Sequence, residues 1–249
     1  MNSKITSLLR WADDALILGQ RLAEWCGHGP VLEQDIALTN ISLDLIGQAR
    51  SYYQYAAELE GSDSTEDTFA FHRDVPEFKN HLLVEQPNGH WGVTILRQFF
   101  FDTYHFYLLE GLRKSNDATI AAIAEKAIKE VSYHAQYTAE WVIRLGDGTE
   151  ESKAKMEEAL DLMWMWTPEL FESDEVDSEA VTQGYGVDPS TLKEAWTQKI
   201  TQVLGLATLQ VPENPWGQTG GRNGNHTEHL GFLLAEMQYL PKSYPDAKW

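Results

Sequence analysis

The stretch KEVSYHAQYTAEW at positions 129–141 comes close to a metal-binding sequence. A helical Glu followed three residues later by His presents two metal ligands on one helix face, which is half of a di-iron carboxylate site. Here the residue three places after Glu130 is Tyr133, and the histidine follows one place later as His134. The stretch therefore has the residue types of a di-iron site without their spacing.

A second stretch departs from the same pattern. In DLIGQ, Asp44 is followed at the third position by Gly47, which has no side chain, and at the fourth by Gln48. A glutamine amide is a poor ligand for iron, which prefers carboxylates and imidazoles. Neither of the two helices expected to carry Glu-x-x-His thus keeps the motif.

Asp102 and His105 do have the i, i+3 spacing. They fall, however, on the third long helix, from which only one carboxylate is expected in a di-iron site. The favoured interpretation is that they hydrogen-bond each other or neighbouring helices.

At the four positions where the Glu-x-x-His spacing is lost, we expect a buried polar network. Buried carboxylates need partners, and a cation can stand in the place of a metal. The four positions are Asp44, Gln48, Glu130 and His134, and the candidate cations are Lys126, Lys129 and Arg97.

The string HTEHLG at 226–231 offers a third candidate, since His226, Glu228 and His229 are all possible zinc ligands. Their spacing is not the His-Glu-x-x-His of a metalloprotease. The string follows a glycine-rich stretch and begins a helix, so His226 or Thr227 is expected near the N-cap. A structural or interface role is favoured over metal binding.

Helical periodicity dominates the chain and predicts an all-α protein. The expected helices are 4–26, 31–59, 65–71, 75–82, 91–114, 117–145, 150–170, 188–209 and 226–240. Residues 171–180 and 184–189 are expected to form an acidic loop, and the Pro- and Gly-rich residues 211–225 an irregular segment. With 60–90 as a crossover, this order fits one ferritin-like helical bundle with additional C-terminal helices over residues 1–249.

The composition of the chain argues against several kinds of partner and site. The net charge of -19 argues against nucleic acid and anionic membranes as partners, because both are bound through Lys and Arg. The single cysteine, Cys26, excludes a disulfide framework within the chain. We find no signal peptide, no apolar run that could span a membrane and no nucleotide-binding glycine loop, so a cytoplasmic protein is expected.

Four separated segments together resemble one known family. They are EWCGHGPVLEQDIALTNISLDLIGQAR (24–50), LLVEQPNGHW (82–91), KAIKEVSYH (126–134) and HTEHLGFLLAEMQYL (226–240). The family is that of the C subunits of the bacterial phenylacetyl-coenzyme A ring 1,2-epoxidase, a multicomponent monooxygenase of aerobic phenylacetate degradation.

The resemblance implies a division of labour among the protein components. The catalytic A subunit holds the di-iron centre and takes the thioester substrate. The C subunit is a paralogue of similar fold that pairs with A and has lost the metal ligands. The system also includes a small B subunit and a reductase with flavin and an iron–sulfur cluster, which takes electrons from NADPH. No catalytic, metal-binding or cofactor-binding residue is therefore assigned to this chain.

Two other functions remain open from the residues alone. One is a free-standing di-iron oxidase with an atypical site made from Asp44, Asp102, His105, Glu130 and His134. The other is a helical binding protein with no link to oxygenation. For a structural subunit, either the aromatic helix 91–114 or the segment 211–240 could supply the face that contacts the catalytic partner.

Overall fold

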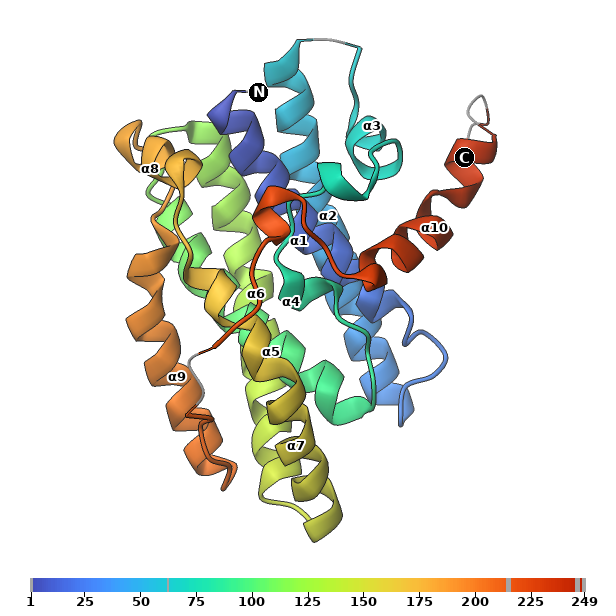
Figure 1. Ribbon diagram of the computed structural model, residues 1–249, viewed down its shortest axis with the longest axis vertical. Helices are drawn as coiled ribbons and strands as arrows, with labels where there is room; N and C mark the ends of the chain where they lie inside the picture. The colour runs from blue at the N-terminus through green and yellow to red at the C-terminus, as the bar shows by residue number, and fades with distance from the viewer. Residues whose placement is uncertain (1, 62, 214–215, 245–246, 248–249) are drawn as a thin grey trace. The chain divides into compact units, whose positions relative to one another are not determined.

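The computed structural model describes the whole chain except residues 1, 62, 214–215, 245–246 and 248–249, so part of the predicted irregular segment lies outside the described residues. The described residues form helices, turns and loops, without a strand among them, which confirms the all-α class (Figure 1). The chain divides into two compact units, Met1–Gln86 with Gly220–Trp249, and Pro87–Thr219. The single ferritin-like domain over 1–249 stays a prediction.

The first unit is built on two long helices packed along each other. Its elements are α1 (Ser3–Ala23), α2 (Leu32–Glu60), α3 (Glu66–Phe71), a 3-10 turn (Val75–Glu77), α4 (Leu82–Glu85), a second 3-10 turn (Gly221–Asn223) and α10 (Glu228–Ser243). Gly19 allows the long pair to approach closely, because a Cβ there would lie 3.1 Å from Ile46 and 3.3 Å from the Ser42 carbonyl. At the same place the Ser42 hydroxyl donates to the Gly19 carbonyl over 2.7 Å.

The second unit is also built on a long helix pair. Its elements are α5 (Trp91–Leu112), α6 (Ala118–Gly146), α7 (Glu150–Met163), 3-10 turns at Trp164–Trp166 and Pro168–Phe171, α8 (Glu175–Thr182), a 3-10 turn at Pro189–Leu192 and α9 (Lys193–Leu206). Phe100 of α5 packs against Trp164 and Trp196, with ring centroids 5.8 and 5.7 Å apart. The Trp196 indole also donates to the Phe100 carbonyl over 2.9 Å, so this core is specified by geometry as well as by burial.

The expectation of an acidic loop at 171–180 is wrong in part, because α8 begins inside it. Asp174 is the N-cap of α8 and accepts hydrogen bonds from the backbone N–H groups of Val176 and Asp177. The Asp177 side chain in turn accepts a bond from the Asp174 backbone, which completes a capping box. The acidic residues that suggested a loop are thus the N-terminal turn of a helix, where negative charge is favourable.

Several predicted helices end earlier than expected, and the helix expected at 75–82 is wrong, because a 3-10 turn at Val75–Glu77 stands there before α4. The helix at 150–170 stops at Met163 and continues as 3-10 turns, the second of which has Pro168 at its start. The helix at 188–209 ends at Leu206, because Thr208 adopts a left-handed backbone with φ of 57°.

Replacing the α8 cap should measure its contribution. We expect Asp174→Ala to lower the free energy of unfolding by about 1 kcal/mol, because two backbone N–H groups lose their acceptor. Asp161→Ala, the same change at an exposed position inside α7, is the matched control and should not lower stability. Urea unfolding of both variants measures the difference; equal stabilities would contradict the role of the cap.

Candidate functional site

Asp102 is a buried carboxyl in the core of the second unit. It lies on α5, fully buried, and accepts a hydrogen bond of 2.7 Å from the Gln98 side chain. Across on α6, the Thr138 hydroxyl lies 3.3 Å from Asp102 and 2.8 Å from the His134 carbonyl. A hydroxyl has one proton, so Thr138 shares it between the two acceptors and its bond to Asp102 is the longer one.

Burial is what favours the protonated form of Asp102. Burial raises the pKa of Asp102 to about 7, while the nearby His134 and the hydrogen bonds from Gln98 and Thr138 act in the opposite direction. A carboxyl in an apolar site disfavours its charged form, and here that effect dominates. Asp102 thus holds a proton below neutral pH, where an exposed aspartate would already be charged.

His105, three residues after Asp102, has the spacing of a metal motif and is buried on α5. The imidazole of His105 packs beside the Phe101 ring, with centroids 5.3 Å apart. Asp102 is hydrogen-bonded within α5 and to α6, while the hydrogen bonding expected of His105 stays a prediction.

The residues of the incomplete metal motif on α6 differ in their burial. His134 is completely buried, Glu130 is half-buried, and Tyr133, in the place of the expected histidine, is 53% exposed. The shift of one residue thus turns a tyrosine outward and keeps the imidazole inside. On α2 of the other unit, Asp44 is half-buried and Gln48 buried.

The predicted cations do not all lie inside. Lys126 and Lys129 are exposed on α6, so the expectation that either neutralises a buried network is wrong for the lysines. These residues project from the outer face of the helix, which their sequence spacing from His134 did not reveal. Arg97 is fully buried and donates to the Asn88 side chain over 2.7 Å.

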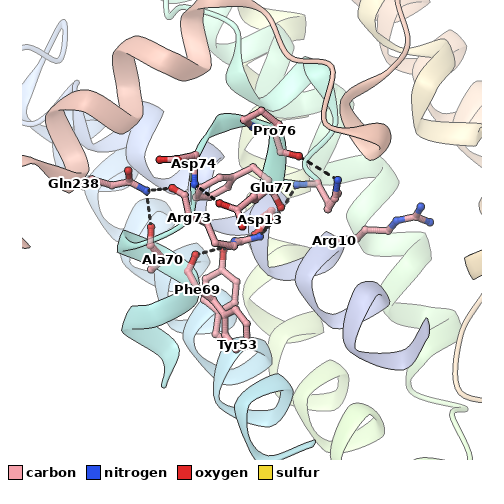
Figure 2. A network of polar contacts seen from close by, with 12 residues as sticks. Arg10, Asp13, Tyr53, Phe69, Ala70, Arg73, Asp74, Pro76, Glu77 and Gln238 are labelled. Atoms are coloured by element: carbon pink, nitrogen blue, oxygen red, sulfur yellow. Dashed lines mark hydrogen bonds and ion pairs between the residues drawn. The ribbon is translucent and has the colours of Figure 1, made fainter. Parts of the chain in front are cut away.

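Among its described residues the first unit holds three further buried carboxylates, two of them adjacent on α1. Asp13 accepts bonds from the Tyr53 hydroxyl at 2.5 Å, the Lys79 backbone at 2.6 Å and both terminal nitrogens of Arg73 (Figure 2). Arg73 is itself held by the Phe69 carbonyl at 2.7 Å and covers the ring of Phe78 at 4.1 Å. Both oxygens of Asp13 are therefore occupied by protein donors.

Asp14 is compensated by different partners. The Arg222 guanidinium lies 2.9 Å from it, and the backbone N–H and the ring of His81 lie at 2.7 and 3.0 Å. Burial alone would raise the pKa of Asp14, but Arg222 and His81 outweigh it and lower the pKa to about 2. The carboxylate is consequently charged throughout the physiological range.

The predicted site at 226–231 contributes to the third cluster, around Glu85. The Glu85 carboxylate accepts from the His226 ring at 2.8 Å, from the Thr227 backbone at 2.7 Å and from the Thr227 hydroxyl at 2.8 Å. The other ring nitrogen of His226 lies 2.9 Å from the Phe78 carbonyl. Since both neighbours are acceptors, the protonated ring fits best. Burial opposes that form, but the bonds to Glu85 raise the pKa of His226 above its ordinary value.

The other residues of this string lie differently. Thr227 is the N-cap of α10, as expected, although its hydroxyl bonds Glu85 instead of the helix. Glu228 is exposed, and the backbone carbonyl of His229 accepts a 3.0 Å bond from Arg21. The side chain of His226 is completely enclosed.

These donor sets do not suit a di-iron centre. Within the part of the chain that the structure describes, no three or more His, Cys, Asp or Glu side chains gather so that they could hold a metal. Asp102 is engaged by Gln98 and Thr138, and the carboxylates of the first unit are engaged by Arg, His and backbone donors. None of the helices in the described ranges has the length and hydrophobicity to cross a bilayer.

Only a partial signal for these clusters is present in the sequence. Asp13 and Asp14 stand out as neighbouring acids within an apolar helix. Their cations, Arg73 and Arg222, come from segments 60 and 208 residues away, and no spacing rule connects them.

An all-α protein with buried carboxylates on long paired helices fits the class of ferritin-like helical proteins. The whole chain, residues 1–249, matches the family described as phenylacetic acid catabolic protein, and the chain belongs to this family. It is 50% identical over 249 residues, the full length of both proteins, to the C subunit of the 1,2-phenylacetyl-CoA epoxidase of Escherichia coli (strain K12). The resemblance seen in four sequence segments is thereby confirmed.

Removing the cation beside Asp13 should be costly. We expect Arg73→Met to lower the free energy of unfolding by roughly 3–5 kcal/mol, because a buried charge is left without its partner. Arg144→Met, at an arginine side chain that is 64% exposed, should change it by less than about 0.5 kcal/mol. Denaturant unfolding of the two variants measures both values, and a similar small loss in each would refute the role given to Arg73.

The proton on Asp102 should appear as a pH dependence of stability. Because its folded pKa of about 7 lies above the unfolded value of 3.8, stability is lost as pH rises between about 4 and 7 and stays low above that. Asp102→Asn keeps the shape but cannot ionise. Relative to this variant, the wild-type protein should lose about 3 kcal/mol between pH 5 and pH 8. Urea unfolding at both pH values tests this, and a constant difference would contradict it.

Proposed function

We propose that this chain is a non-catalytic structural subunit of a cytoplasmic multicomponent oxygenase that epoxidises the ring of phenylacetyl-CoA. It braces the di-iron catalytic A subunit, which takes the substrate. The oxygenase also includes the small B subunit, and a reductase with flavin and an iron–sulfur cluster supplies electrons from NADPH. This chain itself contributes no cofactor.

The observation that carries the proposal is the full-length similarity to a relative named as the C subunit of the epoxidase. The name of that relative supports a role inside a larger enzyme. It does not by itself separate a catalytic from a structural contribution, so the chemistry of the buried groups is needed.

The buried groups favour the structural role. A di-iron site needs carboxylates with free lone pairs that converge on a shared position. Asp13 and Glu85 instead each accept four hydrogen bonds from protein donors. Asp102 retains a proton up to a pKa of about 7. Such groups stabilise a helical framework without a metal, which is the property required of a brace.

Metal content and association test the proposal together. The chain is purified alone, offered iron(II) under air, and separately co-expressed with the catalytic A subunit of the same enzyme. We expect essentially no iron in the isolated chain, co-elution of the two proteins, and lower epoxidase activity when this chain is omitted. The catalytic subunit treated in the same way is the positive control for iron.

Each competing function predicts a different result. About two irons per chain would identify a di-iron oxidase with an atypical site and overturn the structural role. An iron-free chain that does not co-elute with the catalytic subunit would indicate a helical binding protein outside the oxygenase.

A further inference from the structure

Helix α10 carries apolar side chains on two opposite faces. One face packs within the first unit through the buried residues Leu230, Leu233 and Leu234. It is fixed by Gln238, whose amide donates to the carbonyls of Ala70 and Arg73 over 3.3 and 3.0 Å. A helix that only covered a core would present polar residues on the side away from it.

The opposite face is open and carries large aromatic side chains beside the exposed Glu236. Phe232 and Tyr239, seven residues apart and therefore on one stripe, are each 66% exposed. Leu240 is 49% exposed, and Tyr244, directly after the helix, is 59% exposed. Large aromatic side chains in this position are characteristic of protein interfaces.

Beside this stripe, Leu240 and Tyr244 line a groove between α10 and α3, which lie side by side in Figure 1. The groove has a volume of about 510 Å³ and an apolar floor that includes Phe71, Met237 and Leu240. One carboxylate stands on each wall, Asp67 on α3 and Glu236 on α10. An apolar floor between two acids is complementary to a segment that combines apolar side chains with Lys or Arg.

The area of the stripe fits the centre of an interface. The four exposed side chains leave roughly 500 Å² of surface in water, the size of the largest, often functional, apolar patch on a monomer. A stable interface buries about 800 Å² on each partner. The stripe with the groove and its acidic rim can therefore supply most of one side.

The alternative face, the aromatic helix at 91–114, is largely used inside its own unit. Phe99, Phe100, Phe101 and Tyr104 of α5 are each at most 1% exposed. They form core, whereas the aromatic residues of α10 remain available.

The start of α10 is firmly held, which suits a docking element. Arg222 bonds Asp14, and His226 bonds Glu85, so the segment that leads into the helix is tied to the buried clusters of the first unit. A rigid helix loses little conformational freedom when a partner binds.

We propose that the outer face of α10, with the α3–α10 groove, docks onto the catalytic subunit through an apolar segment of that protein bearing Lys or Arg. This inference rests on the proposed function and specifies the surface that would carry out the bracing. Phe232 and Tyr239 supply the apolar anchors, and Asp67 and Glu236 set the register of the basic residue.

The test measures binding of the full-length chain to the purified catalytic subunit by calorimetry at low and high salt. Phe232→Ser with Tyr239→Ser should weaken binding by at least tenfold, or ~1.4 kcal/mol. Glu236→Lys should weaken it by about threefold to tenfold, most at low salt. Leu162→Ser and Glu157→Lys, exposed positions on α7, are matched controls and should bind as the wild type does.

The outcomes separate this inference from the proposed function. If the wild type and all variants bind equally, docking through α10 is wrong and the structural role stands. If the wild type does not bind, both fail. A wild-type chain that instead dimerises through α10, with the dimer lost in the serine variant, would overturn the catalytic subunit as the occupant. Unchanged thermal midpoints show that the variants fold, and Glu236→Lys tests the surface without removing apolar side chains.

Discussion

The structure depends on the compensation of carboxyl groups buried inside helix pairs. An isolated carboxylate in an apolar interior is expensive, so each one must find a cation, a set of hydrogen-bond donors or a proton. Asp13 has Arg73, Asp14 has Arg222 and His81, and Glu85 has His226. These partners come from separate segments, and meeting them fixes where the segments lie.

In the second unit, Asp102 is compensated by a proton. Asp102 has a hydrogen bond from Gln98 and contact with Thr138, with His134 nearby, and burial keeps a proton on it. The two units therefore treat the same residue type in opposite ways. Arg222 and His81 hold Asp14 charged with a pKa of about 2, while burial holds the pKa of Asp102 near 7. Proximity to a full cation decides between them.

Carboxylates engaged in this way can maintain a helical framework in the absence of a metal. In a di-iron protein the metal collects the charges of several carboxylates and ties their helices together. Here guanidinium groups and the ring of His226 do so in the first unit, and burial favours a proton on Asp102 in the second. The same contacts anchor the segment before α10. They therefore stabilise the interior of the first unit and also hold α10 in place.

Local patterns in the sequence determined the helices, because apolar spacing and end signals act over a few residues. They placed α1, α2, α5, α6 and α10 to within about three residues and showed that Glu130, His134, Asp44 and Gln48 lack the di-iron spacing. They did not reveal α8, since a run of capping acids has the composition of a loop. Only the tertiary structure decided which cation meets which carboxylate, that Lys126 and Lys129 face outward, and that His226 is enclosed. Those outcomes depend on contacts between residues up to 208 positions apart, which no local pattern encodes.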